Sequence, residues 1–443
     1  MTTFFSRILV TLINVPISVL VARTLGTEGQ GGYSAVLTFS TLWGTSFLLG
    51  IDTAHTYLLA GKRYTLRQIV RHSWIWSLIL GAAATPVYWW VAPWLAGDDS
   101  SVFRSVLTLS ALSVPLVMAK YLMLSMFLGE GRVDRFNLLQ VVSNIALLAL
   151  VVVLLLVFPG GIREAVWAYI ASLVVFVILG GVWVAERLRE HQEEPEPVGW
   201  NPELAKSSVV YGLKGHLGTL VTAMTYRLDQ LLVTKMLGLE AQGLYSIAVL
   251  LSEKLSHIPA SIQLILFPRI SASTAEDANR LTPVACRLAF FGVLGAALPL
   301  FLLSEPLVRL FYGHDFLPCL PSLRVLLPGV VLLAVGKILA GDLSGRNRRG
   351  TATVAMTFAF LLNFALDLWW IPRYGIIGAA WATNAAYTAQ TLMLALVFWR
   401  ISGIGPWKLF VPERADAQRV RRVLKGLARS AHVPRTPSER RKV

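Results

Sequence analysis

Leu25-Gly26-Thr27-Glu28-Gly29-Gln30-Gly31-Gly32-Tyr33-Ser34 recurs 212 positions later as Leu237-Gly238-Leu239-Glu240-Ala241-Gln242-Gly243-Leu244-Tyr245-Ser246. Seven of the ten residues are identical, and a basic residue, Arg23 or Lys235, precedes each copy. The first copy follows the first apolar run of the chain and the second follows the seventh. This placement indicates two halves of equal design rather than turn chemistry repeated by chance.

The composition indicates that most of the chain is surrounded by lipid. Of the 443 residues, 55% are hydrophobic and only 15% are charged, and the mean hydropathy is +0.61. Soluble domains are about 45–50% apolar and about 25% charged. So few charges could not cover a surface that faces water, so the sequence predicts an integral membrane protein.

Twelve apolar runs are long enough to cross a bilayer. They predict an all-α membrane fold of about twelve spans, at 4–22, 33–58, 70–92, 104–127, 138–158, 164–185, 208–236, 243–266, 283–303, 319–341, 351–371 and 376–399. The polar stretch 186–206 divides them six and six. We therefore expect a lobe at 1–185, a cytoplasmic linker at 186–206, a second lobe at 207–400 and a basic cytoplasmic tail at 401–443.

Six spans separate the two copies of the repeat, so both copies cross the membrane in the same direction. A weaker second echo supports this, because Pro159 precedes Ala165-Val166-Trp167-Ala168 and Pro372 precedes Ala379-Ala380-Trp381-Ala382. Parallel repeats of this kind form two bundles around a central cavity, and transport follows when one bundle rocks against the other.

Lysine and arginine are concentrated in alternate loops. One set of loops holds little beyond Arg23, Arg104, Arg163, Arg309 and Arg373. The other set holds Lys62, Arg63, Arg67, Arg71, Arg132, Arg135, Arg187, Arg189, Lys206, Arg269, Arg280, Arg287, Arg346, Arg348 and Arg349. Because basic loops remain in the cytoplasm, the sequence predicts a multi-pass protein of a bacterial or archaeal cytoplasmic membrane with both termini inside.

Several stretches resemble one transporter family in their order and spacing. The stretch at 22–33 is similar to the first-loop signature of polysaccharide flippases of the multidrug/oligosaccharidyl-lipid/polysaccharide exporter superfamily. Further similar stretches are Leu228-Asp229-Gln230-Leu231-Leu232, Ile258-Pro259-Ala260-Ser261, Phe267-Pro268-Arg269-Ile270, Pro306-Leu307-Val308-Arg309-Leu310-Phe311-Tyr312-Gly313 and Ile371-Pro372-Arg373-Tyr374-Gly375-Ile376-Ile377-Gly378-Ala379-Ala380. The resemblance covers nearly all of the chain up to about residue 400.

The resemblance implies a two-lobed transporter that flips a lipid-pyrophosphate-linked oligosaccharide across the cytoplasmic membrane during cell-surface polysaccharide synthesis. Other polysaccharide-assembly proteins are then expected partners. The chain departs from the family pattern at Gln230, where a basic residue is common, while Arg227 lies three positions earlier. A pocket charge at position 230 therefore does not carry over.

Ionisable residues inside spans are costly and usually face a cavity or a partner. A cavity lined by cations suits a pyrophosphate, and Arg227 is the strongest candidate because it lies deep in a long span. For each of the others, snorkelling of a long side chain to the membrane surface is the competing interpretation. The candidate cationic residues are Arg227, Lys214, Lys254, Lys120, Arg7 and Lys337.

Two acids, Asp229 and Glu253, are candidates for a coupling-ion site or for structural acceptors that join two spans. Asp229 lies two residues from Arg227, nearly opposite on a helix, so the two are not expected to pair.

The tail from 403 to 443 carries +8 of the chain's net charge of +15. Val420, Val423, Leu424 and Leu427 have helical spacing among basic residues, which indicates either an amphipathic helix on the anionic inner leaflet or a disordered basic tail. No folded nucleic-acid-binding module accompanies this charge, so nucleic-acid binding is not expected.

Two other function classes compete with the flippase. A cation-coupled multidrug or metabolite exporter of the same superfamily would favour acids over bases in its cavity. A multispan glycan polymerase or ligase would need a large outer loop with catalytic residues. The outer loops near 93–104 and 304–318 are short and hold no paired carboxylates, nucleophile elbow or metal-ligand cluster. We therefore expect a transporter without cofactor or bound metal.

Overall fold

The structure is a computed structural model that describes residues 2–96, 101–158, 160–190 and 200–413. Every regular element in these ranges is helical, which confirms the predicted all-α class, and eight helices there are long and apolar enough to cross a membrane. The first seven helices are α1 (Thr2–Phe47), α2 (Ile51–Ala60), α3 (Leu66–Ala96), α4 (Ser101–Ser110), α5 (Ser113–Gly129), α6 (Val133–Val152), continued by η1 (Val153–Val157), and α7 (Ile162–Glu190). The rest are α8 (Pro202–Glu253), η2 (Lys254–Ser256), α9 (His257–Ser271), α10 (Ala275–Leu302), α11 (Ser304–Phe311), η3 (His314–Cys319), α12 (Leu320–Gly345), α13 (Arg349–Ser402) and η4 (Pro406–Leu409).

Three helices are too long for a single crossing. α1, α8 and α13 have 46, 52 and 54 residues, so each would measure at least about 70 Å if straight, against a hydrocarbon core of about 30 Å. Each bends at one glycine with positive φ: Gly26 (φ 68°), Gly238 (φ 87°) and Gly375 (φ 61°). This backbone conformation is strained for residues that carry a Cβ atom. Divided at these glycines, the three helices contain the predicted spans at 4–22, 208–236, 351–371 and 376–399, while those at 33–58 and 243–266 continue beyond α1 and α8. α8 is not among the eight helices of the described ranges that are apolar enough to cross a membrane.

The connections expected within these three pairs of spans are therefore single-residue bends rather than loops. The span predicted at 33–58, by contrast, is not one continuous helix, because α1 ends at Phe47 and α2 begins at Ile51. At the interruption Gly50 has φ 74°, and a Cβ atom there would lie 2.5 Å from the carbonyl oxygen of Gly212. The close approach of α8 explains the break, since only glycine leaves room for it.

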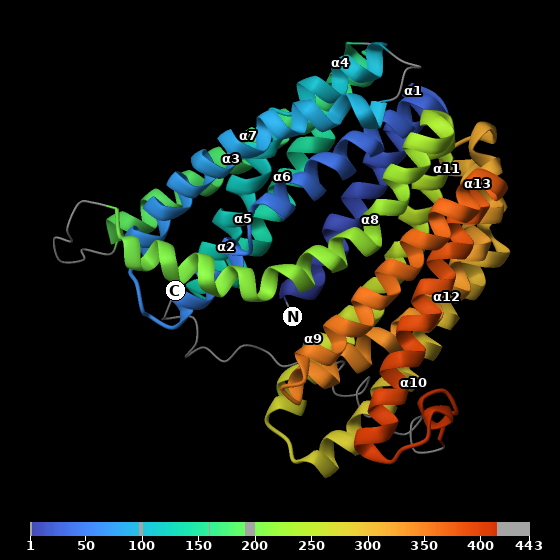
Figure 1. Ribbon diagram of the computed structural model, residues 1–443. Helices are drawn as coiled ribbons and strands as arrows, with labels where there is room; N and C mark the ends of the chain where they lie inside the picture. The colour runs from blue at the N-terminus through green and yellow to red at the C-terminus, as the bar shows by residue number, and fades with distance from the viewer. Residues whose placement is uncertain (1, 97–100, 159, 191–199, 414–443) are drawn as a thin grey trace, which may run out of the picture.

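The helices form two lobes. Figure 1 shows α1–α7 on one side and α9–α13 on the other, with α8 passing between them. Each lobe has its own apolar core, which includes Tyr88 and Phe103 in the first lobe and Tyr245 and Phe316 in the second. This arrangement confirms the predicted two-lobed architecture. We call the end of the molecule that carries Gly26 and Gly238 the motif end, and the end that carries residues 190 and 202 the linker end.

The two copies of the repeated decapeptide meet at the motif end. A Cβ atom on Gly31 would lie 1.8 Å from the carbonyl oxygen of Leu239, and one on Gly243 would lie 1.9 Å from that of Thr27. These contacts are equivalent, because Gly31 and Gly243 occupy matching positions in the two copies, and so do Thr27 and Leu239. The two halves are thus related by an approximate twofold axis, and near this axis the backbones of the two copies are in contact.

Two side-chain hydrogen bonds follow the same symmetry. Gln30 Nε2 donates to Ser246 Oγ at 3.3 Å, and Gln242 Nε2 donates to Ser34 Oγ at 3.4 Å. Both glutamines are buried. The repeated decapeptide therefore forms the contact between the two lobes.

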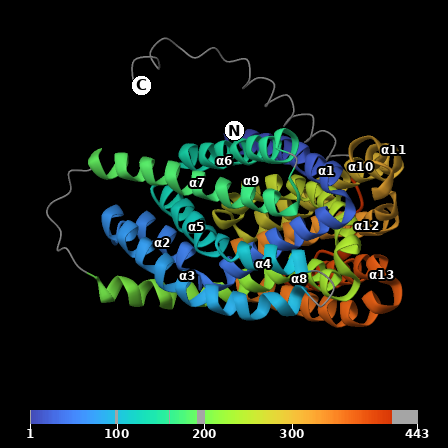
Figure 2. The same ribbon diagram turned by 90° about the horizontal axis from the view of Figure 1, so that it is seen from above.

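α8 contacts both lobes. Its first limb lies beside α2 and α3 (Figure 2), where Tyr211 stacks on Tyr57 with 4.4 Å between ring centroids and Leu204 is fully buried. From Gly218 onwards it packs against α13, where Thr222 Oγ1 lies 3.8 Å from Met356 Sδ. The domain boundary predicted at 206/207 thus falls inside α8, whose first limb packs on the first lobe.

The segment after α13 folds back on α10. Arg287, which is 3% exposed, donates to the carbonyl oxygen of Lys408 at 2.8 Å and lies 3.3 Å from Glu413 Oε1. Leu409 is fully buried, and the ring of Phe410 packs edge-on against that of Phe290. The predicted amphipathic stretch at 420–427 and the acidic part of the linker at 193–197 lie outside the described residues.

Candidate functional site

Arg227 forms an ion pair with Glu253 across the bend of α8. The guanidinium Nη2 and the carboxylate Oε2 are 3.2 Å apart, and Gly238 lies between the two residues in sequence. The bend at Gly238 returns the second limb beside the first, which brings the two charges together. The side chains are 40% and 30% exposed, so the pair faces open space rather than the core of the second lobe.

Two lysines lie near this pair. Lys254 follows Glu253 directly, and Lys337 of α12 places its Nζ 5.3 Å from the centre of the Tyr226 ring. Arg227, Lys254 and Lys337 are all within electrostatic range of the Glu253 carboxylate. We call these four residues the cationic cluster.

Arg227 is the member of the cationic cluster that faces the first lobe. Arg227 is within electrostatic range of Tyr121 of α5, a helix of the first lobe. Tyr226, beside it, lies 6.1 Å from Tyr387 between ring centroids, which fixes the ring under Lys337 against α13. Arg227 therefore faces the space between the lobes, whereas Lys337 lies over an aromatic ring that packs on the second lobe.

The other predicted cations lie elsewhere. Lys120 places its Nζ 5.5 Å from the centre of the Phe176 ring, between α5 and α7 of the first lobe. Lys214 is exposed on the first limb of α8. Arg7 belongs to α1, but its side chain lies outside the described residues. The structure thus brings three of the six predicted cations together and leaves Lys120 and Lys214 apart.

Asp229 points away from Arg227 into the core of the second lobe. Its Oδ2 accepts hydrogen bonds from Tyr245 OH at 2.7 Å and Thr383 Oγ1 at 3.4 Å, and its Oδ1 accepts one from the backbone N–H of Gln230. Asp367 of α13 lies within electrostatic range of Asp229, and the two acids are only 1% and 4% exposed.

The two carboxylates share an environment that is only partly satisfied. Asp367 Oδ2 accepts a hydrogen bond from Asn363 Nδ2 at 2.9 Å, whereas Asp367 Oδ1 is buried with no hydrogen-bond partner among the described residues. The equivalent of Asp229 in the first half is Ile17, so this acidic pair belongs to one lobe only. Burying a charge without a partner is costly, and Asp367 Oδ1 is the atom of the pair that bears this cost.

Sequence reasoning counted Asp367 among the ionisable residues within spans but gave it no role in a site, and it assigned Tyr245 and Thr383 no polar role. A usable signal was present, because Asn363 and Asp367 are four residues apart in an apolar run and so share one helix face. The pairing with Asp229 was not predictable, since the two acids lie far apart in the sequence and on different helices.

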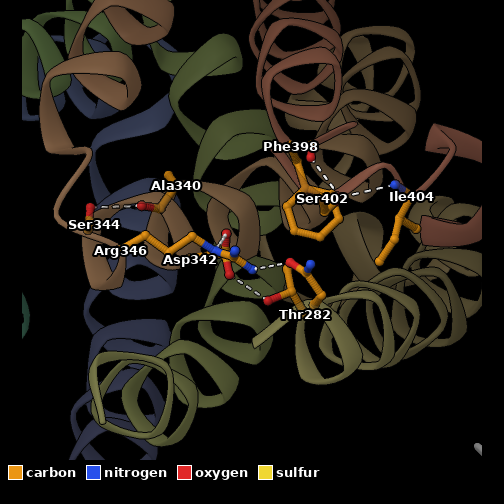
Figure 3. Close-up of polar contacts among 9 residues, drawn as sticks. Thr282, Ala340, Asp342, Ser344, Arg346, Phe398, Ser402 and Ile404 are labelled. Atoms are coloured by element: carbon orange, nitrogen blue, oxygen red, sulfur yellow. Dashed lines mark hydrogen bonds and ion pairs between the residues drawn. The ribbon is translucent and has the colours of Figure 1, made fainter. Parts of the chain in front are cut away.

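A third polar cluster joins α10 and α12 at the linker end. In Figure 3, Thr282 and Arg346 both point to the carboxylate of Asp342, at 2.6 Å from Thr282 Oγ1 and 2.8 Å from Arg346 Nε. Arg346 also donates to Asn279 Oδ1 at 2.8 Å, and its guanidinium lies over the ring of Phe398. Asp342 is fully buried and its carboxylate is satisfied on both oxygens, so the cluster holds helices together.

Comparisons with known proteins agree with this architecture. Residues 20–321 match the profile of the family described as "Polysaccharide biosynthesis protein". The chain belongs to that family. It is a membrane transporter of the multidrug/oligosaccharidyl-lipid/polysaccharide exporter superfamily, as the sequence motifs predicted.

Individual relatives are distant. The chain is 25% identical to "Lipid II flippase MurJ" of Bacillus subtilis, over 90% of this chain and 81% of that protein. It is 24% identical to "Uncharacterized membrane protein MJ1068" of Methanocaldococcus jannaschii over 50% of this chain, and there it spans only 44% of the relative's length. Among solved structures, the inward-facing form of a multidrug resistance MATE family transporter is similar, with a TM-score of 0.72, 16% identity and coverage of 89% and 95% of the two chains. That likeness shows the fold alone.

Proposed function

We propose that this protein flips a lipid-pyrophosphate-linked oligosaccharide from the cytoplasmic to the outer leaflet, for the synthesis of a cell-surface polysaccharide. The observation that carries the proposal is the cationic cluster, where Arg227 faces the first lobe and Lys254 and Lys337 lie near the same Glu253 carboxylate. A pyrophosphate is the anion that arginine and lysine bind well, because guanidinium hydrogen bonds to phosphate oxygens are charge-assisted and geometrically matched.

The ion pair of Arg227 with Glu253 suits a site that must bind and release. Half-exposed ion pairs contribute only about 0–1 kcal/mol, so an entering pyrophosphate displaces Glu253 at little cost. When the substrate leaves, Glu253 pairs with the guanidinium again. In this proposal Glu253 is a counter-ion that keeps the empty site from holding its cargo too tightly.

The orientation of the lobes fits entry from the cytoplasm. Basic residues are concentrated at the linker end, which the positive-inside rule places in the cytoplasm together with both termini. The lobes touch at the motif end through Gly31 and Gly243 and diverge away from it (Figure 1). We infer that alternating access breaks the contacts at the motif end and closes the lobes at the linker end.

We further propose that Asp229 and Asp367 form the coupling-ion site of this transport cycle. The unpartnered oxygen of Asp367 supports this, because a proton or a small cation would satisfy it. Asp229 lies on α8 beside Arg227, so neutralising it acts on the helix that carries the substrate site. The basic tail would add affinity for the anionic inner leaflet, and other polysaccharide-assembly proteins are the partners we expect.

The test is flipping of a fluorescent polyprenyl-pyrophosphate oligosaccharide in proteoliposomes. We expect transport by the wild type and a loss of about 10- to 100-fold in Arg227→Ala, since a hydrogen-bonded charge contributes roughly 1.5–3 kcal/mol. Arg309→Ala is the matched control, because Arg309 is an exposed cation paired with Glu305 at the motif end. Unchanged transport in Arg227→Ala would refute the site. Efflux of small organic cations without lipid transport would favour an exporter instead.

A further inference from the structure

An apolar cavity of about 230 Å³ lies between the lobes on the side formed by α1, α3 and α8. Among the described residues that line it, Ser46 is the one with a hydroxyl group, and the others have aliphatic or aromatic side chains or are Met224. Its principal lining residues are Phe39, Trp43, Trp94, Met224, Leu228 and Leu231. An apolar cavity of about 150 Å³ already stays dry and binds small hydrocarbons. A cavity of this size and lining is therefore a site for hydrocarbon.

The cavity extends from the motif end of the molecule past the middle of the membrane. Trp94 belongs to the motif end of α3, and the lining residues Leu232 and Met224 precede Gly238 by 6 and 14 positions. Those positions correspond to about 9 and 21 Å along the helix, within a hydrocarbon core of about 30 Å. Because Trp94 and Leu232 lie nearest the motif end, the hydrocarbon that reaches this part of the cavity is the chain of a lipid in the leaflet at that end.

A cation lies at the mouth of the cavity. Lys235 follows the lining residues Leu231 and Leu232 by one helical turn, and its Nζ is 5.2 Å from the ring centre of Trp94. The described residues provide no carboxylate within ion-pairing distance of Lys235. A phosphate at the membrane surface would contact both the Lys235 ammonium group and the Trp94 indole ring. Tryptophan is typical of the headgroup level.

The equivalent cation of the first half is already bound to protein. Arg23 holds the position in the first half that Lys235 holds in the second, and it donates to the carbonyl oxygens of Phe311, at 2.8 Å, and Leu310 at the end of α11. Those carbonyls are at the negative end of a helix, where a cation is stabilised. Of the two symmetry-related cations, Lys235 is the one left to bind an anion from the membrane.

We propose that this cavity binds one acyl chain of an anionic phospholipid from the leaflet at the motif end, with the lipid phosphate against Lys235. The orientation proposed above makes this the outer leaflet. Phe39 belongs to the core of the first lobe and Leu232 to that of the second. The shape of the cavity therefore depends on how the lobes are arranged, and a bound chain stabilises the arrangement that is closed at the motif end. The phospholipid thus regulates transport.

The experiment uses the full-length protein in nanodiscs that contain phosphatidylglycerol with a diazirine midway along one acyl chain. After irradiation, we expect labelled peptides within 39–47 and 224–232. Met224→Trp fills the cavity and should reduce this labelling several-fold. Leu12→Trp is the matched control, because position 12 is the equivalent of position 224 in the first half and Leu12 is 62% exposed, outside the cavity lining.

Lys235→Gln tests the headgroup without altering the cavity. It should reduce the preference of the labelling for phosphatidylglycerol over a phosphatidylcholine probe by about fivefold, the effect expected for one lysine near the membrane surface. Arg309→Gln, another cation at the motif end, should leave that preference unchanged. The Lys235 result decides the proposal even if Met224→Trp does not fold.

Labelling that ignores both Met224→Trp and Lys235→Gln would overturn the proposal. So would complete displacement of the phospholipid probe by an equimolar polyprenyl phosphate, which would assign the cavity to the transported carrier. Labelling is measured without transport. Failure of the flipping assay therefore contradicts the proposed function, and failure of the labelling contradicts the lipid site.

Discussion

Replacing Gly31 with alanine should open the motif end. The added Cβ atom would lie 1.8 Å from the carbonyl oxygen of Leu239, whereas carbon and oxygen atoms in contact are about 3.3 Å apart. The lobes must therefore separate by about 1.5 Å at this point. Gly243→Ala should separate the lobes by a similar distance, because its Cβ atom would lie 1.9 Å from the carbonyl oxygen of Thr27.

The magnitude follows from the cost of overpacking. Inserting a methyl group into a close contact costs about 1–3 kcal/mol, and here the cost applies only to the arrangement closed at the motif end. The equilibrium between closed and open arrangements should shift about 5- to 150-fold toward open. The higher helix propensity of alanine acts equally on both arrangements, so it cancels from this ratio.

The assay is the distance between two spin labels at the motif end, at Ser105 of α4 and Arg309 of α11. Cys286 and Cys319, both fully buried, are first replaced with alanine. Gly31→Ala should populate a longer distance than the parent protein and slow flipping.

Gly295→Ala is the control for this prediction. Gly295 lies in a helix with no atom within 4 Å of its Cβ position, so this change should leave the distance distribution unaltered. Superimposable distributions for Gly31→Ala and its parent would refute the argument that this glycine contact sets the closed arrangement.

Three further predictions concern buried charges. Arg346→Ala should lower the free energy of unfolding in detergent by about 3–5 kcal/mol, because it leaves buried Asp342 unpaired. The control Arg309→Ala, at an exposed ion pair, should lower it by at most about 1 kcal/mol. Equal losses for the two variants would contradict this prediction. Asp367→Asn should leave substrate binding intact while abolishing the dependence of flipping on a proton or sodium gradient, and retained dependence would exclude this acid from coupling. Arg287→Ala should release the segment after α13, measured as faster proteolysis within 403–413 with α10 still intact; an unchanged cleavage rate would show that the arginine does not hold it.

The sequence by itself determined the membrane class, the all-α fold and the two-lobed design. Hydropathy is a local property, so a run of apolar residues such as 138–158 predicts a span wherever it lies. The repeated decapeptide identified equivalent positions in the two halves, because seven of its ten residues recur. The sequence predicted a loop after the first and seventh spans, and the structure has a bend at Gly26 and at Gly238 instead. The candidate cations were found because a charge within an apolar run is conspicuous in any fold.

Only the tertiary structure decided which of these residues meet. Gly31 contacts Leu239, and Asp229 lies near Asp367, although the members of each pair belong to helices far apart in the chain. Such contacts depend on how the helices pack, which no local pattern encodes. The same packing placed Arg227 with Glu253 and left Lys120 in the first lobe, although in the sequence both cations lie within apolar runs. The bend at Gly238 explains the difference, because it returns the second limb of α8 beside Arg227 and supplies that cation with its partner.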